Sequence, residues 1–143
     1  MASGYNRGCA LIDVKGSKVV KRWENKNLCA HISTPVYIKG YVFGFNGNSG
    51  SKCKFVCLDP KNGKIKWSKK FTMSTMMVAN DTFIILDERG KLYVSPVSTT
   101  GLKTTAQVDT KLKKVCWTQP VLSNGVIYCR NDKGLLIAID VAK

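Results

Sequence analysis

Cysteine and histidine are among the residue types of this chain that could bind a metal ion or act in nucleophilic catalysis. The 143 residues contain six cysteines and a single histidine, His31. Only Cys53 and Cys57 are close in sequence, and on a regular strand their α-carbons would lie about 13 Å apart. That separation is too large for a disulfide or for one tetrahedral metal site. No CxxC motif and no Cys/His pair with ligand spacing occurs.

We therefore predict reduced, structural thiols rather than a metal centre. A buried free cysteine packs as a small apolar side chain. The thiols that lie among apolar strand residues are Cys9, Cys57, Cys116 and Cys129.

The residues needed for hydrolysis or phosphate binding are also missing from their usual patterns. A Ser-His-Asp triad requires a histidine held beside its nucleophile, and we interpret His31 as a hydrogen-bonded structural residue. Cys29 could pair with its imidazole only if the intervening turn folds back. The glycine-rich segment Asn46–Ser51 has no following helix, so it is expected to be a flexible loop and not a phosphate cradle. The sequence predicts no catalytic residue, no cofactor and no metal.

The net charge of +14, from 23 Lys+Arg against 9 Asp+Glu, is unusual for a chain of this length. Arginine contributes only Arg7, Arg22, Arg89 and Arg130, although proteins that read nucleic acids favour its planar fork. Lysines spread along strands keep sheet edges soluble and unpaired, and this interpretation is favoured. Binding of an anionic polymer or surface is the alternative.

The length suits one compact domain covering residues 1–143, and 44% apolar residues argue against disorder. No apolar run approaches the ~18 residues of a membrane span. Residues 1–8 lack the basic head and apolar core of a secretory signal, so they assign no cellular compartment.

Residues 34–70 show the organisation that the rest of the chain repeats. Thr34–Ile38, Tyr41–Phe45, Lys54–Leu58 and Lys64–Lys69 are short, rich in β-branched and aromatic residues, and separated by turn residues. The segment Asp59–Gly63 combines Pro and Asn-Gly, which favour a tight reversal. These features predict a four-stranded antiparallel meander.

Three further segments resemble this unit, with a period of about 40 residues. Residues 74–109 contain a second full set of four strands, ending with the polar Lys103–Val108. Residues 117–142 contain three strands, and residues 9–26 contain two. No helical pattern of any length occurs. The fold class is therefore all-β, with a small barrel or sandwich as the alternative arrangement.

The repeated pattern resembles the blade of quinoprotein-type (PQQ-like) β-propellers. In this pattern a proline begins the first strand and a glycine precedes the second strand. The third strand ends in Leu-Asp, and a glycine precedes the fourth strand, which contains a tryptophan. The residues that carry it are Trp23, Pro35, Gly40, Asp59, Gly63, Trp67, Trp117, Pro120, Gly125 and Asp140. The resemblance extends over nearly the whole chain and is closest to the C-terminal blades of larger bacterial propellers.

This resemblance implies about three blades whose Trp23 and Trp67 pack between neighbours. Quinone-binding members use adjacent cysteines and a calcium-binding acid set, whereas the acids here lie mostly in turns, so no quinone is expected. Members are often periplasmic or exported. The implied role is a non-catalytic scaffold for protein interaction or assembly. A fragment of a quinoprotein-like oxidoreductase is an alternative.

Three blades are too few for a closed ring, which needs four to eight. An open arc would expose blade faces and strand edges. We therefore expect a segment of a larger propeller. Self-association, with two three-blade arcs giving a six-bladed ring, or pairing with a complementary chain are the alternatives.

Overall fold

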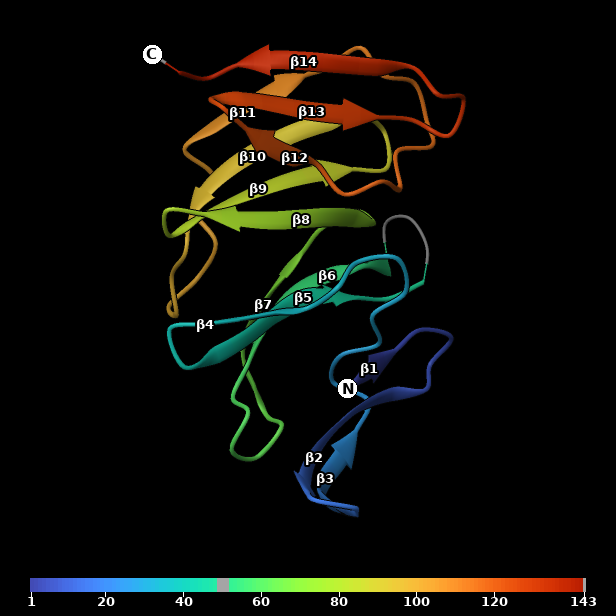
Figure 1. Ribbon diagram of the computed structural model, residues 1–143, viewed down its shortest axis with the longest axis vertical. Coiled ribbons are helices and arrows are strands. Elements are labelled where there is room, and N and C mark those ends of the chain that lie inside the picture. The colour runs from blue at the N-terminus through green and yellow to red at the C-terminus, as the bar shows by residue number, and fades with distance from the viewer. Residues whose placement is uncertain (49–51, 143) are drawn as a thin grey trace.

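The computed structural model describes residues 1–48 and 52–142. Within these residues the chain forms fourteen β-strands in four antiparallel sheets, and no α-helix. The sheets follow one another in chain order along the long axis, from the N-terminal sheet at the bottom of the view to the C-terminal sheet at the top (Figure 1). The predicted all-β class is confirmed, and the arrangement is that of a partial β-propeller.

The second and third sheets are complete four-stranded meanders, in which strands adjacent in sequence are adjacent in space. The second sheet consists of β4 (Val36–Ile38), β5 (Tyr41–Asn46), β6 (Lys54–Leu58) and β7 (Ile65–Lys70). The third consists of β8 (Ser74–Ala79), β9 (Thr82–Asp87), β10 (Lys91–Pro96) and β11 (Ala106–Asp109). The last strand begins later than the expected Lys103, whose carbonyl accepts a hydrogen bond from Ser95 Oγ at 2.6 Å.

The first and last sheets have three strands each. The first consists of β1 (Ala2–Ser3), β2 (Gly8–Lys15) and β3 (Lys18–Asn25), and the last of β12 (Val121–Ser123), β13 (Val126–Arg130) and β14 (Leu136–Asp140). The sequence indicated only two strands in the first sheet. The additional strand, β1, pairs Ala2 with Cys9 and Ser3 with Gly8. The predicted loop Asn46–Ser51 lies partly in residues 49–51, outside the described residues.

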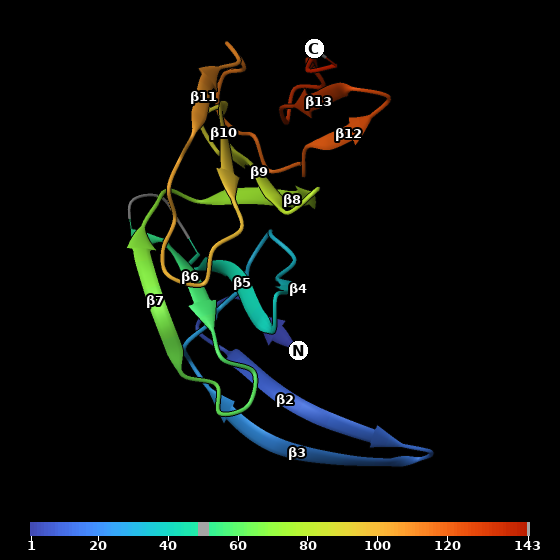
Figure 2. The same cartoon turned by 90° about the vertical axis from the view of Figure 1, so that its left-hand side faces the viewer.

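The same tight turn joins the first two strands of the last three sheets. Both of its central residues have positive φ: 51° and 79° at Lys39 and Gly40, and 49° and 74° at Asn124 and Gly125. Such values define the two-residue turn whose twist matches that of an antiparallel pair. The turn at 80–81 is of the same kind, with φ of 45° and 56°. These turns place β4, β8 and β12 on one side of the molecule, with β7 and β11 toward the other (Figure 2).

The core lies between the sheets rather than within any one of them. An aromatic cluster joins the second and third sheets, where Phe43 and Phe55 lie 5.1 Å and 5.2 Å from Phe83 between ring centroids. Aliphatic residues, including Ile84 and Ile127, fill the space between the third and fourth sheets. A smaller cluster joins the first and second sheets. Each sheet is therefore stabilised by its neighbours, as in a propeller.

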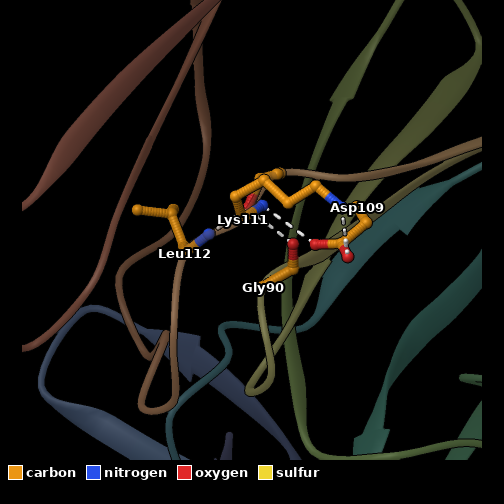
Figure 3. Close-up of polar contacts among 5 residues, drawn as sticks. Gly90, Asp109, Lys111 and Leu112 are labelled. Atoms are coloured by element: carbon orange, nitrogen blue, oxygen red, sulfur yellow. Dashed lines mark hydrogen bonds and ion pairs between the residues drawn. The ribbon is translucent and has the colours of Figure 1, made fainter.

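A compact turn after β11 leads the chain toward the last sheet (Figure 3). Thr110 Oγ1 donates to Gly90 O at 2.6 Å, and Leu112 N donates to Thr110 Oγ1 at 3.2 Å. Lys111 donates its backbone N–H to Asp109 Oδ1 at 2.9 Å, and its Nζ lies 3.1 Å from Asp109 Oδ2. These contacts fix the direction in which residues 113–120 cross to the fourth sheet.

Candidate functional site

Trp23 and Gly63, two of the predicted blade residues, meet where the first sheet packs on the second. Trp23 Nε1 donates to Pro60 O at 2.8 Å. Gly63 O accepts from Asn25 Nδ2 at 2.9 Å and from Asn27 Nδ2 at 2.7 Å. The turn that enters β7 is thus bound by three side-chain hydrogen bonds from β3 and the residues after it. This arrangement holds the first two sheets together.

The aspartates of the motif act within their own turns. Asp59 Oδ1 accepts the backbone N–H of Lys61, and Asp140 Oδ1 accepts that of Ala142, both at 2.9 Å. Asp87 and Asp109 make the same bond to the backbone two residues ahead. A carboxylate that accepts from the backbone in this way closes a turn at a strand end. Asp59 and Asp140 belong to different sheets, whereas Asp87 and Asp109 end β9 and β11 of the same sheet.

The remaining tryptophans occupy different environments. Trp67, in β7, is half-buried against Phe43 and Phe55, with ring centroids 6.0 Å and 5.8 Å away. Its buried Nε1 has no hydrogen-bond partner among the described residues. Trp117 is 49% exposed and lies 6.5 Å from the ring of His31. Trp117 therefore lies at the surface, outside the packed centre of a blade.

The predicted prolines and the other glycines lie at equivalent places in separate sheets. Pro35 is half-buried just before β4, and Pro120 is fully buried just before β12. Gly40 and Gly125 each enter a second strand through the turn described above. Besides the contact of Trp23 with Gly63, the structure places Pro35 and Trp23 in the lining of one cavity between the first two sheets.

All six cysteines are buried, and none of them forms a disulfide. Burial raises the pKa of Cys57, Cys116 and Cys129 to about 11 and also raises the pKa of Cys9. The four thiols predicted to pack as apolar side chains lie in the three core clusters, which confirms that prediction. A thiol with a raised pKa is a poor nucleophile and a poor metal ligand.

His31 lies in a small aromatic group with Tyr5 and Trp117. Its ring is 4.7 Å from the ring of Tyr5, in an edge-on arrangement. Cys29 Sγ contacts Lys26 O at 3.7 Å, so the thiol bonds to the backbone of its own turn. His31 Nδ1 is buried without a partner in the part of the chain that the structure describes, so the expected hydrogen bond to this residue is not seen at that atom. Across the described ranges, no three metal-ligating side chains converge on one point.

Two cavities lie between sheets. One, of about 510 Å³, opens between the first two sheets and is lined by His31, Pro35 and Trp23, among others. The other, of about 460 Å³, lies between the second and third sheets near Lys69, Arg89 and Tyr93. The sequence showed the Lys69-Lys70 pair but not its approach to residues of the next sheet.

The outward face of the last sheet is uncovered. Alternate residues of β13 and β14, such as Ile127 and Ile137, pack into the core. The opposite face carries Val121, Tyr128 and Leu136, which are 55%, 36% and 57% exposed. In the described residues, β14 also pairs only with β13, so the sheet ends in an open edge. A search of the described residues finds no helix suited to spanning a membrane.

No family model matches this chain, and no curated protein matches it. Among solved structures, it is similar to BamB from Moraxella catarrhalis, with a TM-score of 0.69 and 18% sequence identity. The match covers 94% of this chain, which spans only 41% of the BamB chain. Two computationally designed proteins also match. Ika4 has a TM-score of 0.44 and 9% identity, and the match covers 80% of this chain and 96% of the Ika4 chain. Ika8 has a TM-score of 0.46 and 7% identity, and the match covers 91% of this chain and 57% of the Ika8 chain.

At this identity the similarity to BamB concerns the fold alone. The similarity agrees with the stacking of four antiparallel sheets seen here. The described chain has the fold of a partial β-propeller.

Proposed function

We propose that this chain is a segment of a PQQ-like β-propeller that serves as a non-catalytic module for protein interaction or assembly. Residues 34–70 and 74–109 would be full blades, and residues 9–26 and 117–142 partial ones. The proposed partner is a further set of blades, from a second copy or from a complementary propeller chain. The observation that carries this proposal is the uncovered apolar face of the last sheet.

The middle of that face carries an apolar row, and the exposed Asp140 and Arg130 flank it on the same face. Val121 lies opposite Tyr128, and Tyr128 lies opposite Ala138, so three strands present one apolar row to solvent. Between the second and third sheets the corresponding faces are buried around Phe43 and Phe83. Burying a side chain of valine or leucine size contributes roughly 1.5–3 kcal/mol. A blade packed on the row would therefore gain several such contributions.

The open shape of the molecule supports the same proposal. Closed propellers have four to eight blades, most with four strands. Here the sheets at the two ends have three strands each, and β1 and β14 are edge strands that each pair with one neighbour among the described residues. Two copies would supply eight sheets, rather than the six blades expected from the sequence. A strand added by a partner beside β1 or β14 would cover that edge.

Native mass and binding of an apolar dye test the proposal with a matched pair of variants. We expect the wild-type chain either to exceed the mass of one chain or, as a monomer, to bind the dye. Tyr128→Asp places a charge on the apolar row and should abolish either behaviour. Val108→Asp changes an apolar side chain that is 45% exposed in β11, away from that row, and should leave both unchanged.

A monomer that binds no dye would overturn the proposal. Equal effects of the two variants on native mass and dye binding would also contradict the proposal. They would show that an added charge acts in the same way on the apolar row and away from it. Thermal unfolding of both variants, followed by circular dichroism, checks that each remains folded.

A further inference from the structure

The cavity between the second and third sheets has the composition of an anion-binding site. It lies where the end of β7 approaches the turn after β9 and the loop before β11. Lys69 Nζ contacts Leu102 O at 3.1 Å, which joins the two sheets beside it. The lining residues that bear on its chemistry are Lys69, Lys70, Phe71, Thr72, Arg89 and Tyr93.

The geometry points to a binding site for a phosphate monoester carried on a ring, such as a nucleoside monophosphate or a sugar phosphate. The cations would hold the phosphate, and the aromatic wall would contact the ring. The site lies within one chain, so this inference does not depend on the proposed assembly.

The cations at this cavity are uncompensated. Five ion pairs occur among the described residues, and none involves Lys69, Lys70 or Arg89. All three side chains are exposed at the rim. A phosphate monoester carries a charge of about −1.5 to −2 at pH 7 and offers three strong acceptor oxygens. Its hydrogen bonds to lysine and arginine would be charge-assisted.

Among the described residues Asp87 is the one carboxylate that lines the cavity, and its hydrogen bonds are directed within the protein. Its Oδ1 accepts the backbone N–H groups of Arg89 and Lys91, each at 2.9 Å. Its Oδ2 accepts the Tyr93 hydroxyl at 3.2 Å. The lining thus carries three cations against one carboxylate whose oxygens already have donors. The balance of charge favours an anion.

The wall of the cavity combines aromatic surface with a free hydroxyl group. Phe71 and Tyr93 lie 5.1 Å apart between ring centroids, at an interplanar angle of 67°. Burial, with the adjacent Asp87 carboxylate, raises the pKa of Tyr93 to about 12, so its ring carries no phenolate charge that would repel an anion. Thr72 Oγ1 is buried and has no hydrogen-bond partner among the described residues. Such a hydroxyl can donate to a ligand oxygen.

Titration calorimetry with adenosine monophosphate, glucose 6-phosphate and inorganic phosphate, near physiological salt, tests the inference. We expect at least one ring phosphate to bind tenfold or more tightly than inorganic phosphate. Tighter binding of the nucleotide would identify a nucleoside ligand, and tighter binding of the other compound a sugar. Binding of inorganic phosphate as tightly as both would overturn the inference, and so would binding of none of the three probes.

Two sets of variants separate the site from the general basic charge. Lys69→Gln/Lys70→Gln and the single change Arg89→Gln should each weaken binding of the ring phosphate about tenfold. Lys15→Gln/Lys18→Gln removes the same charge as the lysine double variant at the distant β2–β3 hairpin and should change the affinity less than twofold. Equal losses in the two double variants would contradict the inference. Urea unfolding midpoints confirm that each variant is folded.

Discussion

At the scale of single residues, the side chains that could carry chemistry are used for packing. Cys57 and Cys116 are fully buried in two different core clusters, and desolvation is the main cause of their raised pKa values. Burial destabilises the thiolate, so the folded chain keeps these thiols protonated up to a higher pH than the unfolded chain does. The thiols therefore couple stability to pH as well as contributing apolar volume.

The reactivity of the thiols follows from this coupling. At pH 8 we expect iodoacetamide to label Cys57, Cys116 and Cys129 at least about a hundredfold more slowly in the folded chain than in urea, because thiolate is scarce near a pKa of about 11 and access is blocked. Mass spectrometry of peptides checks the sites. Complete labelling within minutes in the absence of urea would contradict this expectation.

The same shifts fix the direction of a pH effect on stability. The folded pKa of these thiols is raised above the ordinary value of 9.0. Their contribution is fully present below that value, and it is lost as the pH rises toward about 11 because the unfolded chain loses its protons first. We expect the free energy of unfolding to fall over this range.

Only some of the residues that line the cavity between the second and third sheets could be grouped from the sequence. Lys69 and Lys70 are adjacent, so their charge is visible in the sequence. Arg89 and Tyr93, by contrast, reach the same cavity from the third sheet, and only the packing of one sheet on the next shows this. The resemblance to a blade motif predicted structural positions, because Pro, Gly and Asp at strand ends act locally. It could not identify a site that two sheets build together.

At the scale of elements, strands with a clear pattern and a tight turn were predictable. Tyr41–Asn46 and Thr82–Asp87 are apolar and follow two-residue turns, and their positions agree with expectation to within one residue. By contrast, β1 has only two residues, Ala2 and Ser3, and neither favours a strand. Its pairing depends on β2 as a template. Such an edge strand is a tertiary effect, which local sequence does not show.

The turn between β6 and β7 is a second element-scale feature with a measurable consequence. Gly63 has a φ of +69°, and an added Cβ would lie 2.7 Å from Trp23 Cε3 and against Asn25 Nδ2. We expect Gly63→Ala to lower the free energy of unfolding by about 2–4 kcal/mol, because the left-handed backbone costs about 1–2 kcal/mol and the packing of the first sheet must also shift. Urea unfolding measures this loss.

Gly134 provides the matched control for that change. It has a φ of +81°, and nothing lies within 4 Å of the position of its Cβ. Gly134→Ala should therefore lose only the backbone contribution of about 1–2 kcal/mol. A loss at Gly63 no greater than the loss at Gly134 would show that the contact between the turn and Trp23 does not stabilise the molecule.

At the scale of the whole molecule, an open stack of sheets carries a large positive charge. The net charge is +14, and the ion pairs of the described residues are mostly exposed. Exposed pairs contribute little, about 0–1 kcal/mol each. Repulsion among the lysines therefore opposes the compact state. The same repulsion would be relieved by an anionic ligand or by an acidic partner surface.

Stability should consequently rise with ionic strength. Between about 0.05 M and about 0.5 M NaCl the screening length falls from above 10 Å to a few ångströms, so we expect the urea midpoint to increase. Lys15 lies directly opposite Lys18 in the β2–β3 hairpin, and like charges in such a pair are destabilising. Lys18→Glu should therefore stabilise the chain by about 0.2–1 kcal/mol at low salt and reduce its response to NaCl. Lys18→Gln is the control, because it removes the repulsion from Lys15 without adding the attraction that a glutamate would bring. A midpoint that does not change with salt in the wild type would show that charge repulsion is not a significant term in the stability of this molecule.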